Sequence, residues 1–116
     1  MSITLTTNYV SGAGFVNNGY SADWSGCETI VAAVSDKSIY IEKIYIISET
    51  TETFTFGAGE TAGSVTATVL GPIYSPGYII LPLEFTRPLK ITASTALTVD
   101  AAGATAATII VQGYIR

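Results

Sequence analysis

A chain of 116 residues and 12.1 kDa has room for a single domain with one hydrophobic core. Hydrophobic residues make up 48% of the sequence and charged residues 12%, which excludes a chain kept unfolded by charge repulsion or by a shortage of apolar surface. The net charge of −4, without any cluster of Lys and Arg, argues against a nucleic-acid partner, and the absence of histidine excludes imidazole-dependent catalysis and imidazole metal sites.

The first 28 residues differ in pattern from the rest of the chain. Residues 3–9 read as one short strand, but four glycines and the turn signal Asn17-Asn18-Gly19 interrupt the sequence that follows. We therefore predict an N-terminal strand and irregular arm over residues 1–28, and a β-sandwich domain over residues 29–116. We expect the arm to serve attachment or intersubunit contact through its large aromatic side chains, which are Tyr9, Phe15, Tyr20 and Trp24.

From residue 29 onward, short runs of alternating apolar and polar residues recur between turn signals, as in an antiparallel sheet. Residues 29–34 form the first predicted strand of the sandwich and residues 38–48 the second. The alternation of the second strand slips by one position at Glu42-Lys43, which predicts a β-bulge. The inward residues of this strand are then Ile39, Ile41, Ile44 and Ile46.

The middle of the chain predicts two strands with interruptions. Phe54 and Phe56 are expected to point inward from a short strand, and residues 57–60 predict a polar, mobile loop after it. Alternation resumes over residues 65–69 and stops at Gly71-Pro72, because proline has no N–H to donate to a neighbouring strand.

The remaining sequence predicts four further strands. Residues 78–83 place Ile79, Leu81 and Leu83 on one face, while Pro82 favours an edge position or a strand end over a central strand. The inward residues of the later strands are Leu89, Ile91 and Ala93, then Leu97 and Val99, then Ala107, Ile109 and Val111.

Eight short strands in about 90 residues, plus the N-terminal strand, favour an all-β antiparallel sandwich of jelly-roll-like type, because two facing sheets bury one face of every strand. Threonine is the commonest residue and suits the outer faces of such sheets. Its branched Cβ fits the pleat while its hydroxyl group binds water.

Acidic side chains offer the only candidate chemistry, and we predict that the chain is not an enzyme. Two carboxylates suffice for glycoside hydrolysis, but the available residues, Glu49 with Glu52 and Glu84 or Asp100 with a neighbour, have no oriented base beside them. Calcium-loop spacing and thiolate clusters are missing, so no metal and no cofactor are expected. Cys27 is predicted to be a buried apolar residue. No stretch approaches 18 apolar residues, and we expect no membrane partner.

Several large apolar side chains fall on predicted outer faces of the sandwich. Aromatic patches that are poor in charge are typical of protein interfaces. We therefore predict self-assembly through Tyr40, Tyr45, Ile47, Ile110 and Tyr114, together with the aromatic residues of the arm. The alternative is a carbohydrate- or receptor-binding module, in which Trp24 and the tyrosines stack on sugar rings.

Five parts of the sequence carry a resemblance to a known family. They are Lys43-Ile44-Tyr45-Ile46-Ile47-Ser48, Leu70-Gly71-Pro72-Ile73-Tyr74, Ile80-Leu81-Pro82-Leu83, Pro88-Leu89-Lys90 with Leu97-Thr98-Val99, and Gln112-Gly113-Tyr114-Ile115. With these segments the chain resembles the small jelly-roll-like virion proteins of tailed bacteriophages, particularly head decoration or cement proteins.

The resemblance covers about residues 29–116. It implies a homo-oligomer, often a trimer, that is made in the host cytoplasm and sits on the capsid surface of the virion. There it would reinforce contacts between subunits of the major capsid protein. A place in a tail or fibre stays open, and no catalytic residue is implied.

Overall fold

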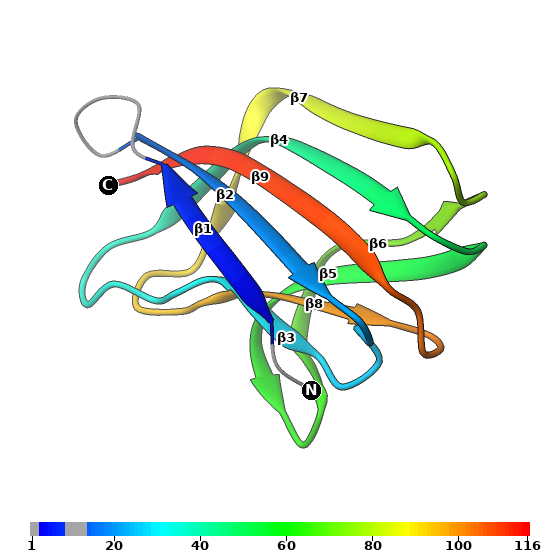
Figure 1. Cartoon of the computed structure of the whole chain (residues 1–116). Helices are drawn as coiled ribbons and strands as arrows, with labels where there is room; N and C mark the ends of the chain where they lie inside the picture. Colours follow the sequence, from blue (N-terminus) through cyan, green and yellow to red (C-terminus); the bar gives the residue numbers. More distant parts are fainter. Residues whose placement is uncertain (1–2, 9–13) are drawn as a thin grey trace.

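The computed structural model describes residues 3–8 and 14–116, which form nine strands in two sheets (Figure 1). The strands are β1 (Thr4–Asn8), β2 (Gly14–Ser21), β3 (Glu28–Val31), β4 (Ile39–Ser48), β5 (Glu52–Thr61), β6 (Ser64–Ser75), β7 (Ile80–Ile91), β8 (Leu97–Ala101) and β9 (Ala107–Ile115). One sheet has the order β1-β2-β9-β4-β7 and the other β3-β8-β5-β6, and every pairing is antiparallel. The described residues contain no helix, so the prediction of an all-β antiparallel sandwich is confirmed.

Most connections carry the chain from one sheet to the other. Only the hairpins β1–β2 and β5–β6 join strands that are neighbours in the same sheet. Each sheet is therefore assembled from strands that are distant in sequence, as where β4 lies between β9 and β7. The two sheets bury a common core between them, because one face of each strand is apolar.

The core confirms most of the inward residues that alternation predicts. Its largest fully buried side chains are Trp24, Phe15, Phe54, Phe56, Ile30, Ile39, Ile41, Ile44, Ile46, Ile91, Leu97 and Ile109. The indole Nε1 of Trp24 donates a hydrogen bond to the Ala107 carbonyl oxygen over 2.9 Å, which satisfies the only polar atom of this side chain inside the core.

The bulge predicted in β4 is confirmed. The register of β4 shifts between Ile41 and Lys43 against both of its neighbours, β7 and β9. Gly113 of β9 lies opposite Ile41 at this point, and a Cβ atom there would press against the backbone carbonyl of Tyr40. Glycine is therefore required where β9 approaches the bulged strand closely.

The prediction of an irregular arm is wrong for residues 14–21. These residues form β2, which pairs with β1 on one side and with β9 on the other. The Asn-Gly signal within it serves packing instead of a turn, since the Asn17 Nδ2 atom donates to the Ile30 carbonyl oxygen over 2.9 Å. A side chain at Gly19 would collide with the side chain of Ile30, so the turn signal reflects a tight contact between sheets.

The predicted loop over residues 57–60 is also wrong, because β5 continues through it to Thr61. Gly57 and Ala58 are buried and pair with both β6 and β8. A Cβ atom on Gly57 would lie 2.6 Å from the Cβ atom of Val65, so this glycine permits close strand approach. Nor does Gly71-Pro72 end the next strand, since β6 runs through it to Ser75.

Residues 80–91 form one long strand where the sequence predicts two. Pro82 lies in this strand, β7, which is an edge of the five-stranded sheet, and the predicted edge position is confirmed. Ile79 precedes the strand and is 47% exposed, while Ala93 follows it and is exposed, so both inward assignments are wrong. The predicted inward leucines of this strand are only half-buried, because an edge strand is covered from one side.

Candidate interaction surface

The outer face of the five-stranded sheet brings together the five interface residues predicted for the sandwich. Cross-strand register places Tyr40 opposite Tyr114, Tyr45 opposite Ile110, and Ile47 opposite Thr108 on β4 and β9. Alternate β4 residues fill the core, so these side chains point away from it. All five are half-buried by their neighbours on the sheet.

At one end of this face, two tyrosines stack between two cations. The rings of Tyr40 and Tyr114 have centroids 4.9 Å apart and an interplanar angle of 11°. The Lys90 Nζ atom lies 5.9 Å from the centre of the Tyr40 ring, and the Arg116 Cζ atom lies 5.5 Å from that of Tyr114. Cation–π attraction adds to the ring contact, and together these four side chains form what we call the cationic strip.

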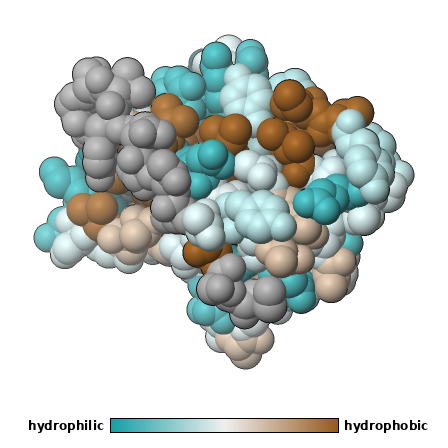
Figure 2. Space-filling view, viewed as in Figure 1, coloured by the Kyte–Doolittle hydropathy of each residue, from teal (hydrophilic) through white to brown (hydrophobic). Residues whose placement is uncertain are grey.

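Beyond Lys43, the far end of the same face is mostly apolar. Register places Ile80 of β7 beside Ile47, and Pro82 of β7 beside Tyr45. Tyr20 of β2 lies opposite Thr108, on the other side of β9. Ile80 is 63% exposed and Tyr20 is 42% exposed, and Figure 2 shows hydrophobic surface over the right-hand parts of β4 and β7. We call the group of Tyr20, Tyr45, Ile47, Ile80 and Ile110 the apolar sheet face.

A second exposed group lies at the connection from β6 to β7. Tyr74 is 63% exposed and Tyr78 is 84% exposed. Tyr78 has a positive φ of 59°, and its N–H donates to the Ser48 carbonyl oxygen at the end of β4 over 2.8 Å. The Thr51 hydroxyl donates to the Pro76 carbonyl oxygen over 3.0 Å, which fixes this connection against the loop that follows β4. Sequence reasoning missed these tyrosines, although the turn Ser75-Pro76-Gly77 points to them.

The four aromatic residues predicted to act from the arm have three different outcomes in position. Phe15 is 2% exposed and Trp24 is fully buried, so both belong to the core and offer no surface to a partner. Their assignment to an interface is therefore wrong. Tyr20 is exposed on the apolar sheet face, and Tyr9 lies outside the described residues.

Buried polar groups lie near the start of β3 and along β8. Glu28 Oε2 and Asp100 Oδ1 have no hydrogen-bond partner among the described residues. Burial raises the pKa of the Asp100 carboxyl above its ordinary value of 3.8. Burial also raises the pKa of the Cys27 thiol, and the prediction that Cys27 is buried is confirmed.

Of the candidate acid pair Glu49 and Glu52, the second is bound to the backbone. Glu52 Oε2 accepts hydrogen bonds from the backbone N–H groups of Thr53 and Gly103, over 3.0 and 3.1 Å. This carboxylate therefore ties the start of β5 to the turn after β8. Within residues 3–8 and 14–116, no group of three or more metal-ligating side chains is placed to hold an ion, and no helix is long and apolar enough to cross a membrane.

No protein-family model and no curated protein matches the sequence. Among solved structures, the chain is similar to one from Ralstonia eutropha JMP134 named a "putative mannose-6-phosphate isomerase". The identity is 6% and the TM-score 0.34, with 95% of this chain and 83% of that chain covered. A likeness at this TM-score carries no argument about what this chain does.

Proposed function

We propose that this chain is a non-enzymatic structural protein that assembles with copies of itself, and that it decorates and stabilises a phage capsid by contacts to the major capsid protein. The observation that carries self-assembly is the apolar sheet face, where Tyr20 and Ile80 are exposed on either side of Tyr45, Ile47 and Ile110. The place on a virion rests on the family resemblance of the sequence.

The apolar sheet face is costly to leave in water. Apolar surface gains roughly 25 cal/mol for each Å² removed from water, and patches with aromatic residues and few charges are typical of protein interfaces. The chain has few charges with which to keep such faces apart, since only 12% of its residues are charged. Association that covers this face therefore lowers its free energy.

The strand order supports a jelly-roll sandwich as the framework of this proposal. Strands β2-β9-β4-β7 face β3-β8-β5-β6, with β1 added at one edge, and from β2 onward successive strands alternate between the sheets except for the β5–β6 hairpin. Jelly rolls occur in viral capsid proteins, and also in lectins and cupins, so the fold is compatible with a virion role without requiring one.

Sedimentation velocity at micromolar concentration tests self-assembly. We expect a closed oligomer, most simply a trimer of about 36 kDa, which is three chains of 12.1 kDa each. Ile80→Asp should shift the protein toward the monomer, whereas Val34→Asp should not, because Val34 is 39% exposed in a loop outside this face. A wild-type monomer of 12.1 kDa would overturn the proposal.

Cosedimentation with purified phage capsids tests the second half of the proposal. We expect the wild-type chain to pellet with capsids and electron microscopy to show added density on their surface. A chain that assembles by itself but remains in the supernatant would leave self-assembly standing and refute decoration.

A receptor- or carbohydrate-binding module is the second candidate, and the exposed rings of Tyr74 and Tyr78 favour it. Exposed aromatic rings at a loop can stack on sugars. In that case Tyr78→Ala would weaken binding on a glycan array while the oligomeric state stays unchanged. No binding by the wild-type chain would exclude this candidate for the sugars on the array.

A further inference from the structure

The two ends of β4 differ in charge. The chain has five Lys and Arg residues. Each lies just before β4, within its first half, or on a segment beside that half. Lys37 precedes the strand, Lys43 lies at its middle, Lys90 pairs with Tyr40, and the backbone of Arg116 bonds to that of Ser38. Arg87 belongs to the same part of β7, between the residues paired with Lys43 and with Ile41. Three acids share this region: Asp36, Glu42 and Glu84.

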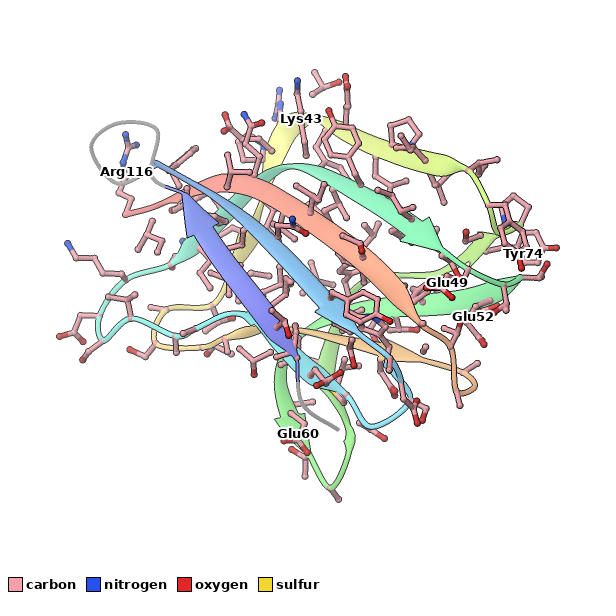
Figure 3. All side chains as sticks on the ribbon, viewed as in Figure 1. Lys43, Glu49, Glu52, Glu60, Tyr74 and Arg116 are labelled. Atoms are coloured by element: carbon pink, nitrogen blue, oxygen red, sulfur yellow. The ribbon has the colours of Figure 1, made fainter. Side chains whose placement is uncertain are left out.

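The other end of β4 has acids without any cation. Three segments of the chain meet at this end of β4 or run toward it, and they contain no Lys or Arg. They are residues 44–55, 72–83 and 100–110. Glu49 is exposed directly after β4, and Glu52 begins β5. Figure 3 shows Glu49, Glu52 and Tyr74 gathered on the right, far from Arg116 on the left. We call Glu49, Glu52, Tyr74 and Tyr78 the acidic corner.

We propose that the acidic corner of one copy docks on the cationic strip of a second copy, so that the chains associate head to tail. This rests on the proposed self-assembly and names the surfaces that meet in it. Each surface pairs exposed or half-exposed tyrosine rings with charge of one sign, and the signs are opposite. Complementary charge of this kind sets the orientation of two partners.

The separation of the two surfaces means that the contact must join two different copies of the chain. They lie at opposite ends of β4, a strand of 10 residues that spans about 30 Å. A single copy therefore cannot bring its own two surfaces together, whereas two copies related by a two-fold axis can join both pairs of surfaces at once. Repeated head-to-tail contact gives a closed ring if the rotation between copies closes, as in a trimer, and a filament if it does not. The apolar sheet face adjoins the acidic corner, since Ile47 precedes Ser48, whose carbonyl oxygen accepts a hydrogen bond from the Tyr78 N–H.

A charge exchange tests the proposal. The strip variant is Lys90→Glu, and the corner variant is Glu49→Lys; Glu52 is left intact because its carboxylate holds backbone N–H groups. Each variant alone cancels the charge of one surface, because Arg116 or Glu52 keeps its original sign, so we expect its dissociation constant for self-association to rise about tenfold or more. A chain that carries both exchanges should regain the wild-type oligomer, since the exchanged residues then bring opposite charges together at every contact.

Matched controls make the same change of net charge elsewhere. Lys37→Glu controls for the strip variant and Glu60→Lys for the corner variant, because both residues are exposed outside the two surfaces. These controls should assemble as the wild type does. If a charge reversal lowers the melting temperature, the neutral exchanges Lys90→Gln and Glu49→Gln are measured instead, with a smaller expected loss.

The outcomes separate this proposal from the proposed function. A monomeric wild-type chain would refute self-assembly and this proposal together. A wild-type oligomer that both variants preserve, or a chain with both exchanges that fails to recover from the loss seen in each variant, would overturn head-to-tail docking and leave self-assembly through the apolar sheet face standing.

Discussion

Phe54 and Phe56 alternate with Thr53 and Thr55 along β5, and the two rings are buried while the threonines are half-exposed. We expect Phe56→Ala to lower the free energy of unfolding by about 3–5 kcal/mol, because it removes a buried ring and leaves a cavity. Thr55→Ala should change it by about 0.5 kcal/mol or less. Urea denaturation measures both, and equal losses would show that the register of β5 is shifted by one residue.

Asp100 gives a prediction for pH dependence. Burial raises the pKa of its carboxyl above 3.8, so the folded state holds this proton more tightly than the unfolded state does. The contribution of Asp100 to stability is therefore lost as pH rises from the ordinary pKa through the raised one. We expect Asp100→Asn to be more stable than the wild type at neutral pH, with the difference vanishing below the ordinary pKa of 3.8.

Thermal unfolding of the two proteins at a series of pH values measures this difference. Asp23 contributes in the opposite direction, because hydrogen bonds from the Ser25 hydroxyl and backbone N–H lower its pKa. Comparing variant with wild type cancels that contribution. Asp36→Asn, in an exposed turn, is the matched control; a gain at neutral pH from this exchange as large as that from Asp100→Asn would contradict the assignment.

Among the elements, β2 has the largest consequence for stability. It lies between β1 and β9, and the residues in and after it supply Phe15 and Trp24 to the core. We expect a chain shortened to begin at Cys27 not to fold, because it loses two strands, two buried rings and one of the two partners of β9. Circular dichroism during heating should show no cooperative transition. A cooperative transition would mean that residues 29–116 fold by themselves, as the sequence pattern suggests.

Two of the mistaken predictions, the irregular arm and the loop over residues 57–60, share one physical cause. Gly19 and Gly57 lie within strands, at points where a Cβ atom would collide with a core side chain or with a neighbouring strand. A glycine required by close packing has the same local signature as a glycine required by a turn. The bulge of β4 could be predicted because the pattern of its own side chains shifts with it.

For the molecule as a whole, the strand order predicts slow folding. Neighbouring strands such as β2 and β9, or β3 and β8, are far apart in sequence, and loop-closure entropy must be overcome before their contacts form. We expect the main refolding phase to take milliseconds to seconds. Stopped-flow fluorescence of the buried Trp24 measures it, and a main phase in microseconds would be inconsistent with this topology.

The sequence by itself determined the fold class, the inward residues of β4, β5, β8 and β9, and the edge position of Pro82. Strand alternation has a period of two, so a few residues are enough to assign each side chain to a face. The alternation in the sequence also placed five large side chains on outer faces, since these side chains alternate with buried residues. These assignments need no knowledge of which strand lies beside which.

Only the tertiary structure decided which outer residues lie together. Tyr40 and Tyr114 stack because β4 pairs with β9, and Tyr20 joins the apolar sheet face because β2 flanks β9. Strand pairing of this kind depends on both sheets burying their apolar faces against each other. A local sequence pattern does not contain that information. The separation of charge to the two ends of β4 has the same origin, because cations scattered along the sequence are gathered only when the strands pair.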